Sequence, residues 1–332
     1  KVSSGEVFKK FASVPIIKKS THENTFSLIG ENLEDADSKT ETMVKESSVH
    51  NLVLLPRRVS ILRSIDYTQL LLQGDLGGGR NADVTRIAKW TVTGGVGTVS
   101  KRGIFLPAQD GNGTIVASLG GKEISVPVVV SGFGRKWTPD FIEDVNPIIS
   151  KLGCNAGTCH GAKDGKNGFK LSLRGYDAVY DVRGFTDDMA CRRVNVAAPE
   201  SSLMLLKASG MVPHEGGQLT DSQSKYYQVI RAWIAGGACL DENGVRVRKV
   251  EMFPKDPVAE KIGSSQQMRV VATMENGMVR DVTREAFITS GNGEVAEHDD
   301  FGLLTTLRRG EAPILARYEG CYAATTLTVM GD

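Results

Sequence analysis

The sequence has few aromatic residues, few cysteines and almost no net charge. Aromatic side chains make up 6% of its 332 residues, and 40 basic residues nearly balance 39 acidic ones. A net charge of +1 offers no broad electrostatic surface to a nucleic acid or an anionic membrane, so neither partner is expected. No apolar run approaches the roughly 18 residues needed to cross a bilayer, which argues against a direct membrane span.

Patterns typical of enzymes are also missing. The sequence shows no Ser-His-Asp order and no paired carboxylates, and Gly77-Gly78-Gly79 is interpreted as a turn because no helix pattern follows it. An enzymatic role is therefore the weaker expectation, and any catalytic domain would lie outside this chain. The chain begins at Lys1 without a signal-like apolar stretch, which indicates a processed chain or an excerpt of a longer protein.

The cysteines do not suggest a disulfide scaffold. An odd number in a chain of this size argues against a framework of bridges, so each cysteine is interpreted from its own surroundings. The five are Cys154, Cys159, Cys191, Cys239 and Cys321.

Two stretches of the chain have the same β-rich pattern. Residues 1–50 are polar and are predicted to form an extension or linker. Short β-branched runs separated by glycine, aspartate and asparagine predict an all-β sandwich over residues 51–132, and the pattern returns over residues 249–332. Asp83-Val84-Thr85-Arg86 matches Asp281-Val282-Thr283-Arg284 at an offset of 198 residues, which indicates an internal duplication.

The segment between these stretches, residues 137–247, has helical patterns instead. Thr138-Pro139-Asp140 is a good helix start, and the apolar stripe that follows runs up to Cys154. A second helix is predicted after Thr220, with capping-box spacing at its start and Gly236-Gly237 at its end.

The helical segment contains Cys154-Asn155-Ala156-Gly157-Thr158-Cys159-His160. Two nearby thiols can attach to the vinyl groups of one haem, and a histidine directly after the second thiol would lie beneath the iron. The usual spacing places two residues between the cysteines, whereas here there are four. A local Cys154–Cys159 disulfide and a structural zinc site are the alternatives, but the pattern favours one covalently attached haem c with His160 as an axial ligand.

A six-coordinate iron needs a second axial ligand. Met211 and His214 both precede the closing helix, and another ligand or an open position is a further alternative. Methionine would raise the reduction potential of the iron, and a second histidine would lower it.

The motifs of the helical segment resemble those of a known family. The Cys154–Gly161 run, residues 165–177 and Val212-Pro213-His214-Glu215-Gly216-Gly217 resemble the planctomycete-type cytochrome c domain. The Asp-Val-Thr-Arg and Gly-Leu-Leu-Thr segments of the flanks resemble group 2 bacterial immunoglobulin-like (BIG2) domains. The resemblance implies two all-β immunoglobulin-like sandwiches flanking a mainly α cytochrome c-like domain. It also favours His214 over Met211 as the second ligand.

Cys191 and Cys239 depart from the family pattern. A disulfide between them would brace the haem domain, and the alternative is that both are buried thiols. The first functional hypothesis is an exported electron-transfer module of the periplasm or cell envelope, served by redox partner proteins or by further domains of a longer chain. The second is a structural or adhesive envelope protein in which the central domain is a connector.

Overall fold

The computed structural model describes residues 44–188 and 192–331. Strands hold 36% of the residues and helices 16%. The predicted fold class is therefore wrong: the chain is mostly β-sheet, and its centre is not a mainly α cytochrome c-like domain. One physical reason is glycines such as Gly153, whose left-handed backbone (φ 77°) follows a helical run that extends only from Phe141 to Lys151. Long irregular segments therefore separate short helices.

The first β unit covers residues 44–130, all of which are described, and follows a short 3₁₀ turn, η1 (Glu46–Ser48). Its hydrogen-bonded sheets have the strand orders β1-β4-β5, β2-β10-β9-β6 and β3-β8-β7. Burial alternates along β10, so one face of this strand enters the core. The strands are β1 (Asn51–Leu55), β2 (Val59–Ile61), β3 (Thr68–Gln69), β4 (Leu71–Gly77), β5 (Arg80–Asp83), β6 (Lys89–Val92), β7 (Gly97–Val99), β8 (Ile104–Pro107), β9 (Gly111–Leu119) and β10 (Lys122–Val130).

The second β unit, residues 245–330, repeats this topology. Its sheet orders are β11-β14-β15, β12-β20-β19-β16 and β13-β18-β17, which match those of the first unit strand for strand. The repeated Asp-Val-Thr-Arg motif therefore belongs to a duplicated fold. The strands are β11 (Val247–Phe253), β12 (Val258–Ala259), β13 (Ser265–Gln267), β14 (Arg269–Met274), β15 (Val279–Asp281), β16 (Phe287–Ser290), β17 (Ala296–His298), β18 (Leu303–Thr306), β19 (Gly310–Tyr318) and β20 (Cys321–Val329).

The helical unit lies between them in sequence, over residues 138–240. Its first helical turn begins two residues later than predicted, with Asp140 rather than Thr138 as the N-cap, because the Asp140 side chain accepts a hydrogen bond from the backbone N–H of Glu143 at 2.8 Å. The last helix starts later than predicted, with Ser224 rather than Thr220 as its N-cap. The elements are η2 (Phe141–Val145), α1 (Asn146–Lys151), η3 (Leu173–Gly175), α2 (Ala178–Thr186), η4 (Pro199–Ser201), α3 (Leu203–Ala208) and α4 (Lys225–Ala235).

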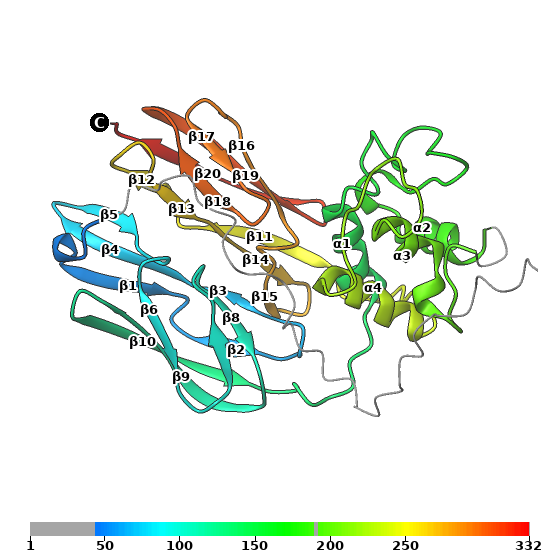
Figure 1. The fold of residues 1–332 in the computed structure, drawn as a ribbon, viewed down its shortest axis with the longest axis horizontal. Coiled ribbons are helices and arrows are strands. Elements are labelled where there is room, and N and C mark those ends of the chain that lie inside the picture. The colour runs from blue at the N-terminus through cyan, green and yellow to red at the C-terminus, as the bar shows by residue number, and fades with distance from the viewer. Residues whose placement is uncertain (1–43, 189–191, 332) are drawn as a thin grey trace, which may run out of the picture.

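Each unit has its own apolar core. Phe105 and Ile115 are fully buried in the first β unit, Ile314 in the second, and Phe141 and Trp233 in the helical unit. The two β units lie side by side, and the helical unit lies at one end of the pair (Figure 1). Among the residues that the structure describes, no helix combines the length and the apolar character needed to cross a membrane.

The domain boundaries 51–132, 137–247 and 249–332 stay a prediction about independent folding. The three cores agree with that division, but the polar contacts described below cross every boundary.

Candidate functional site

Each copy of the Asp-Val-Thr-Arg motif binds the opposite β unit. Asp83 Oδ2 accepts a hydrogen bond from the backbone N–H of Gln267 at 2.6 Å. Asp281 Oδ2 accepts one from the backbone N–H of Gln69 at 2.9 Å. Gln69 and Gln267 are separated by the same 198 residues as the two aspartates. The contact is therefore reciprocal, as in a symmetric dimer, although both halves belong to one chain.

The motif itself explains this geometry. In the first unit, Asp83 Oδ1 accepts from the backbone N–H of Thr85 at 2.9 Å, and the Thr85 hydroxyl accepts from the N–H of Leu72 at 2.9 Å. In the second unit, Asp281 Oδ1 and Thr283 make the corresponding bonds. One carboxylate oxygen thus fixes the turn, and the other contacts both the opposite unit and an arginine of its own unit.

Arginine side chains extend the contact. Arg86 pairs with Asp83 at 3.0 Å and also donates to the carbonyl oxygen of Ser265 in the second unit at 3.2 Å. Arg102 of the first unit forms an ion pair with Asp299 of the second. Charged hydrogen bonds of this kind fix orientation as well as adding attraction.

The helical unit joins the two β units at a buried polar cluster. The Tyr67 hydroxyl donates to Glu285 Oε2 at 2.7 Å and accepts from the backbone N–H of Arg284 at 2.7 Å. Lys225, the first residue of α4, donates to Glu285 Oε1 at 2.9 Å. Its ammonium also lies 4.4 Å from the centroid of the Tyr67 ring. We call Tyr67, Lys225 and Glu285 the triple junction, because each comes from a different unit.

The triple junction holds a charged carboxylate in the interior. Burial opposes ionisation of Glu285, but Lys225, Arg280 and the Tyr67 hydroxyl outweigh it and lower the pKa of this carboxyl to about 2. Burial and the charge of Glu285 raise the pKa of Tyr67 well above its usual value. At neutral pH the tyrosine is therefore a neutral donor to a carboxylate.

Asp144 of the helical unit forms a second bridge. Its Oδ1 lies 3.1 Å from an Nη atom of Arg63 in the first β unit and 3.1 Å from one of Arg280 in the second. Arg63 also pairs with Asp66 at 2.9 Å. Burial opposes the charge of Arg280, but Tyr318, Asp144 and Asp66 together raise its pKa well above the usual value. One buried carboxylate is thus shared by both β units.

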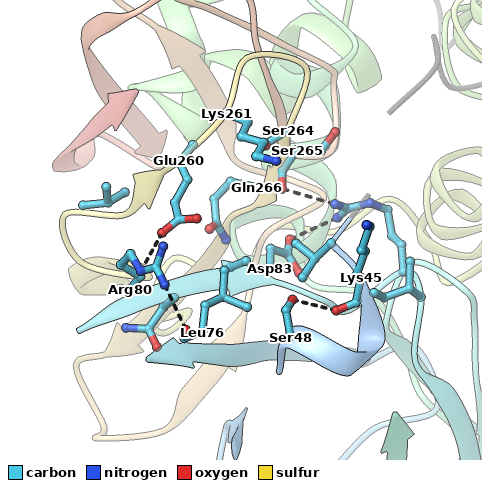
Figure 2. Close-up of a pocket in the computed structure, with 17 residues that line it drawn as sticks. Lys45, Ser48, Leu76, Arg80, Asp83, Glu260, Lys261, Ser264, Ser265 and Gln266 are labelled. Atoms are coloured by element: carbon cyan, nitrogen blue, oxygen red, sulfur yellow. Dashed lines mark hydrogen bonds and ion pairs between the residues drawn. The ribbon is translucent and has the colours of Figure 1, made fainter. Parts of the chain in front are cut away.

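A cavity of about 410 Å³ remains between the two β units, beside β5, β12 and β13. Figure 2 shows Arg80 reaching across it to Glu260, with 3.3 Å between Nε and Oε1. Asp83 lies on its wall with Arg86 as ion-pair partner. Charges of both signs on these walls compensate one another across the gap, so the cavity belongs to the contact between the units.

The predicted Cys-His site lies in an irregular segment after α1. Burial, reinforced by the nearby Cys159, raises the pKa of the Cys154 thiol to about 12, and the side chain packs against the apolar core. His160 Nδ1 lies 3.0 Å from the carbonyl oxygen of Phe169, and the two rings are 4.6 Å apart. Burial lowers the pKa of His160.

The predicted second ligands lie on an exposed loop. His214 Nδ1 lies 3.0 Å from the carbonyl oxygen of Gly217, three residues further along the same loop. The Met211 side chain is 75% exposed. Cys191 lies outside the described residues, so its predicted disulfide with Cys239 also lies outside them. Cys239 itself is exposed.

The prediction of a haem c cofactor is wrong. Within the described ranges, no group of three or more His, Cys, Asp or Glu side chains is placed to hold a metal ion. Cys154 is a partly buried thiol whose pKa is raised to about 12, whereas Met211 faces solvent. The spacing of four residues between the cysteines was the sequence signal that this run departs from the haem-attachment pattern. The predictions of iron binding and electron transport depended on the haem and are corrected with it.

Comparisons with known proteins do not place the chain in a family. No family model and no curated protein matches the sequence. Among solved structures, the chain aligns with domains 1–6 of the surface layer protein SbsC over 87% of its own length and 29% of that chain, with 10% identity and a TM-score of 0.24. It also aligns with SbsC domains 5–6 (85% of this chain, 98% of that chain, 11% identity, TM-score 0.34) and with Yersinia pseudotuberculosis InvD (87% and 59%, 10% identity, TM-score 0.18).

The TM-scores of these alignments are too low to transfer a fold or a function. The chain spans less than a third of the first of these structures. The resemblance to planctomycete-type cytochrome c and BIG2 domains is corrected, because no family model matches and the chain is mostly β-sheet.

Sequence reasoning missed the residues of the triple junction. Lys225 at a helix start and Glu285 after a turn have the composition of solvated positions, and their burial depends on units that are distant in the sequence. The repeated Asp-Val-Thr-Arg motif was the available signal, because Glu285 directly follows its second copy.

Proposed function

We propose that this chain is a rigid structural spacer of a cell-envelope or surface protein. In this proposal the two β units are fastened to each other, and the helical unit is the connector that fixes one end of the pair. The reciprocal contact of Asp83 and Asp281 with the backbone of the opposite unit is the observation that carries the proposal.

The contacts between the units restrict their relative motion. Domains joined by small polar interfaces are expected to move relative to each other. Here several of the bonds that cross between units end on buried carboxylates, and an open arrangement would leave Asp144 or Glu285 without the cations that compensate it. Separation therefore costs the pairing of buried charges, which is far more than the loss of an exposed ion pair.

A spacer role also agrees with the chemistry of the described residues. Buried polar groups such as Asp144 and Glu285 hold units together, and Cys154 of the Cys-His segment packs against the core of the helical unit. The predicted structural or adhesive envelope protein is accordingly the hypothesis that we retain, with other envelope proteins or further domains of a longer chain as partners.

Labelling of intact cells tests the proposed location. An amine-reactive biotin reagent that does not cross membranes should modify this protein on living cells of its native host, at exposed lysines such as Lys249. A cytosolic enzyme followed in the same samples is the control for lysis. Recovery of the protein only in the cytosolic fraction, and labelling only after lysis, would contradict the proposal.

A further inference from the structure

A second cavity, of about 350 Å³, lies between the helical unit and the second β unit. Arg174 approaches it from η3, Arg246 from the start of β11 and Arg317 from β19. Pockets that hold small organic ligands begin at about 300 Å³, so this one suits a compact molecule.

The three arginines have no carboxylate partner. Among the described residues, none of Arg174, Arg246 and Arg317 forms an ion pair with an acidic side chain. The guanidinium of Arg317 instead lies 4.2 Å from the centroid of the Phe287 ring. Burial and the nearby charge of Arg174 lower the pKa of Arg317. Three positive charges thus line a cavity whose ionised carboxylate, Glu285, is already paired with Lys225.

Glu319 lines the same cavity but does not compensate the charge of the arginines. Its Oε1 is buried and has no hydrogen-bond partner within the described part of the chain. Burial raises the pKa of this carboxyl to about 8; Arg280 and Arg246 oppose the rise, whereas Glu143 and Asp144 add to it. The group is therefore mostly a neutral acid at pH 7 and can donate a hydrogen bond.

Two exposed aromatic rings line the cavity beside the arginines. Tyr176 is 79% exposed and Tyr322 is 54% exposed. Arg174 Nη1 lies 3.4 Å from the Tyr322 hydroxyl, so a flat ring and a cation are presented together. Such a surface suits a ligand that combines a ring with polar substituents.

We infer that this cavity binds a small ligand that carries an oxyanion on a hydroxylated ring, such as a sugar acid or a sugar phosphate. Guanidinium groups bind carboxylate and phosphate oxygens through pairs of hydrogen bonds, and three arginines without a carboxylate partner line this cavity. The inference does not depend on the spacer role, because the arginines and tyrosines that the ligand would contact take no part in the bonds between the β units, although Glu285 of the triple junction also lines the cavity.

Calorimetric titration of the full chain at pH 7 tests the inference. Glucuronate and glucose 6-phosphate are the two ring anions, and glucose and inorganic phosphate are the matched partial ligands. We expect saturable one-to-one binding of at least one ring anion, and the preferred one identifies carboxylate or phosphate as the source of the oxyanion. Absence of saturable binding of both at millimolar concentration, or equally tight binding of inorganic phosphate alone, would overturn the inference.

Variants locate the binding. Arg174→Gln and Arg317→Gln should each weaken it about tenfold, equivalent to roughly 1.4 kcal/mol. Arg248→Gln is the control, because Arg248 is exposed on β11 and does not line the cavity. Thermal unfolding of each variant establishes that it is folded. Equal affinity in the wild type and in both cavity variants would refute this location.

The pH dependence of binding provides a second test, through Glu319. Binding should weaken as the pH rises through about 8, because ionised Glu319 would repel the ligand. In Glu319→Gln this pH dependence should disappear while binding at pH 7 remains. Persistence of the same pH dependence in the variant would show that Glu319 does not face the ligand.

Discussion

Replacing Glu285 with glutamine should lower the free energy of unfolding by about 3–5 kcal/mol, the usual cost of breaking a buried ion pair by removing one partner. The substitution keeps the shape of the side chain but leaves the Lys225 ammonium buried without a counter-charge. It also weakens the hydrogen bond that the Tyr67 hydroxyl donates. Urea denaturation at pH 7, followed by circular dichroism, measures the change.

Acid should remove the same stabilisation from the wild type. The pKa of Glu285 is lowered to about 2 in the folded chain, whereas an unfolded glutamate titrates near 4.3. A lowered pKa contributes stability that is complete above the unfolded value and is lost as the pH falls towards the folded value. The difference between the wild type and Glu285→Gln should therefore shrink between about pH 4.3 and pH 2.

Glu294→Gln is the matched control for this prediction. Glu294 also pairs with a cation, Arg308 at 2.8 Å, but both side chains are largely exposed. Exposed pairs contribute about 0–1 kcal/mol, so this variant should unfold almost like the wild type. Equal and small effects of the two substitutions would mean that the triple junction does not hold the units together.

The reciprocal contact leads to a second large effect. Asp83→Asn and Asp281→Asn should each destabilise the chain by about 1–3 kcal/mol, because each weakens a charged hydrogen bond to the opposite unit and leaves a buried cation less compensated. Because the two contacts are equivalent halves of a duplicated structure, the two losses should be similar. Chemical denaturation of the single and double variants provides the measurement.

The control has the same local turn without the contact between units. Asp75 Oδ1 accepts from the backbone N–H of Gly77 at 2.7 Å, as Asp83 does from Thr85. Asp75→Asn should therefore report the cost of the turn alone. If it destabilised the chain as much as Asp83→Asn, the contribution assigned to the contact would vanish.

The duplication could be predicted from the sequence, but the contact between the copies could not. Local repetition of Asp-Val-Thr-Arg and alternating runs such as residues 124–130 are properties of neighbouring residues, and they translate directly into strands. Gln69 and Gln267 carry no such pattern, because their role depends on backbone N–H groups that meet across the chain. The sequence therefore indicated two copies without showing that they face each other.

In the Cys-His segment, by contrast, the sequence predicted a site that the structure does not support. Cys154, Cys159 and His160 have the residue types of a haem-attachment run, but a short motif does not encode the surroundings of its side chains. The partial burial of Cys154 comes from the helical core against which it packs. Spacing alone could not reveal that burial, nor could it show Met211 in solvent.

A distance measurement between the β units tests the central claim most directly. Thr91 on β6 and Thr289 on β16 are equivalent exposed positions of the two units. Nitroxide labels attached there through keto side chains leave the native cysteines unmodified, and pulsed electron resonance then gives the distribution of distances between the labels. We expect one narrow distribution in the wild type and a broader one in the Asp83→Asn, Asp281→Asn double variant. A broad distribution in the wild type would show that the units move independently and would contradict the account.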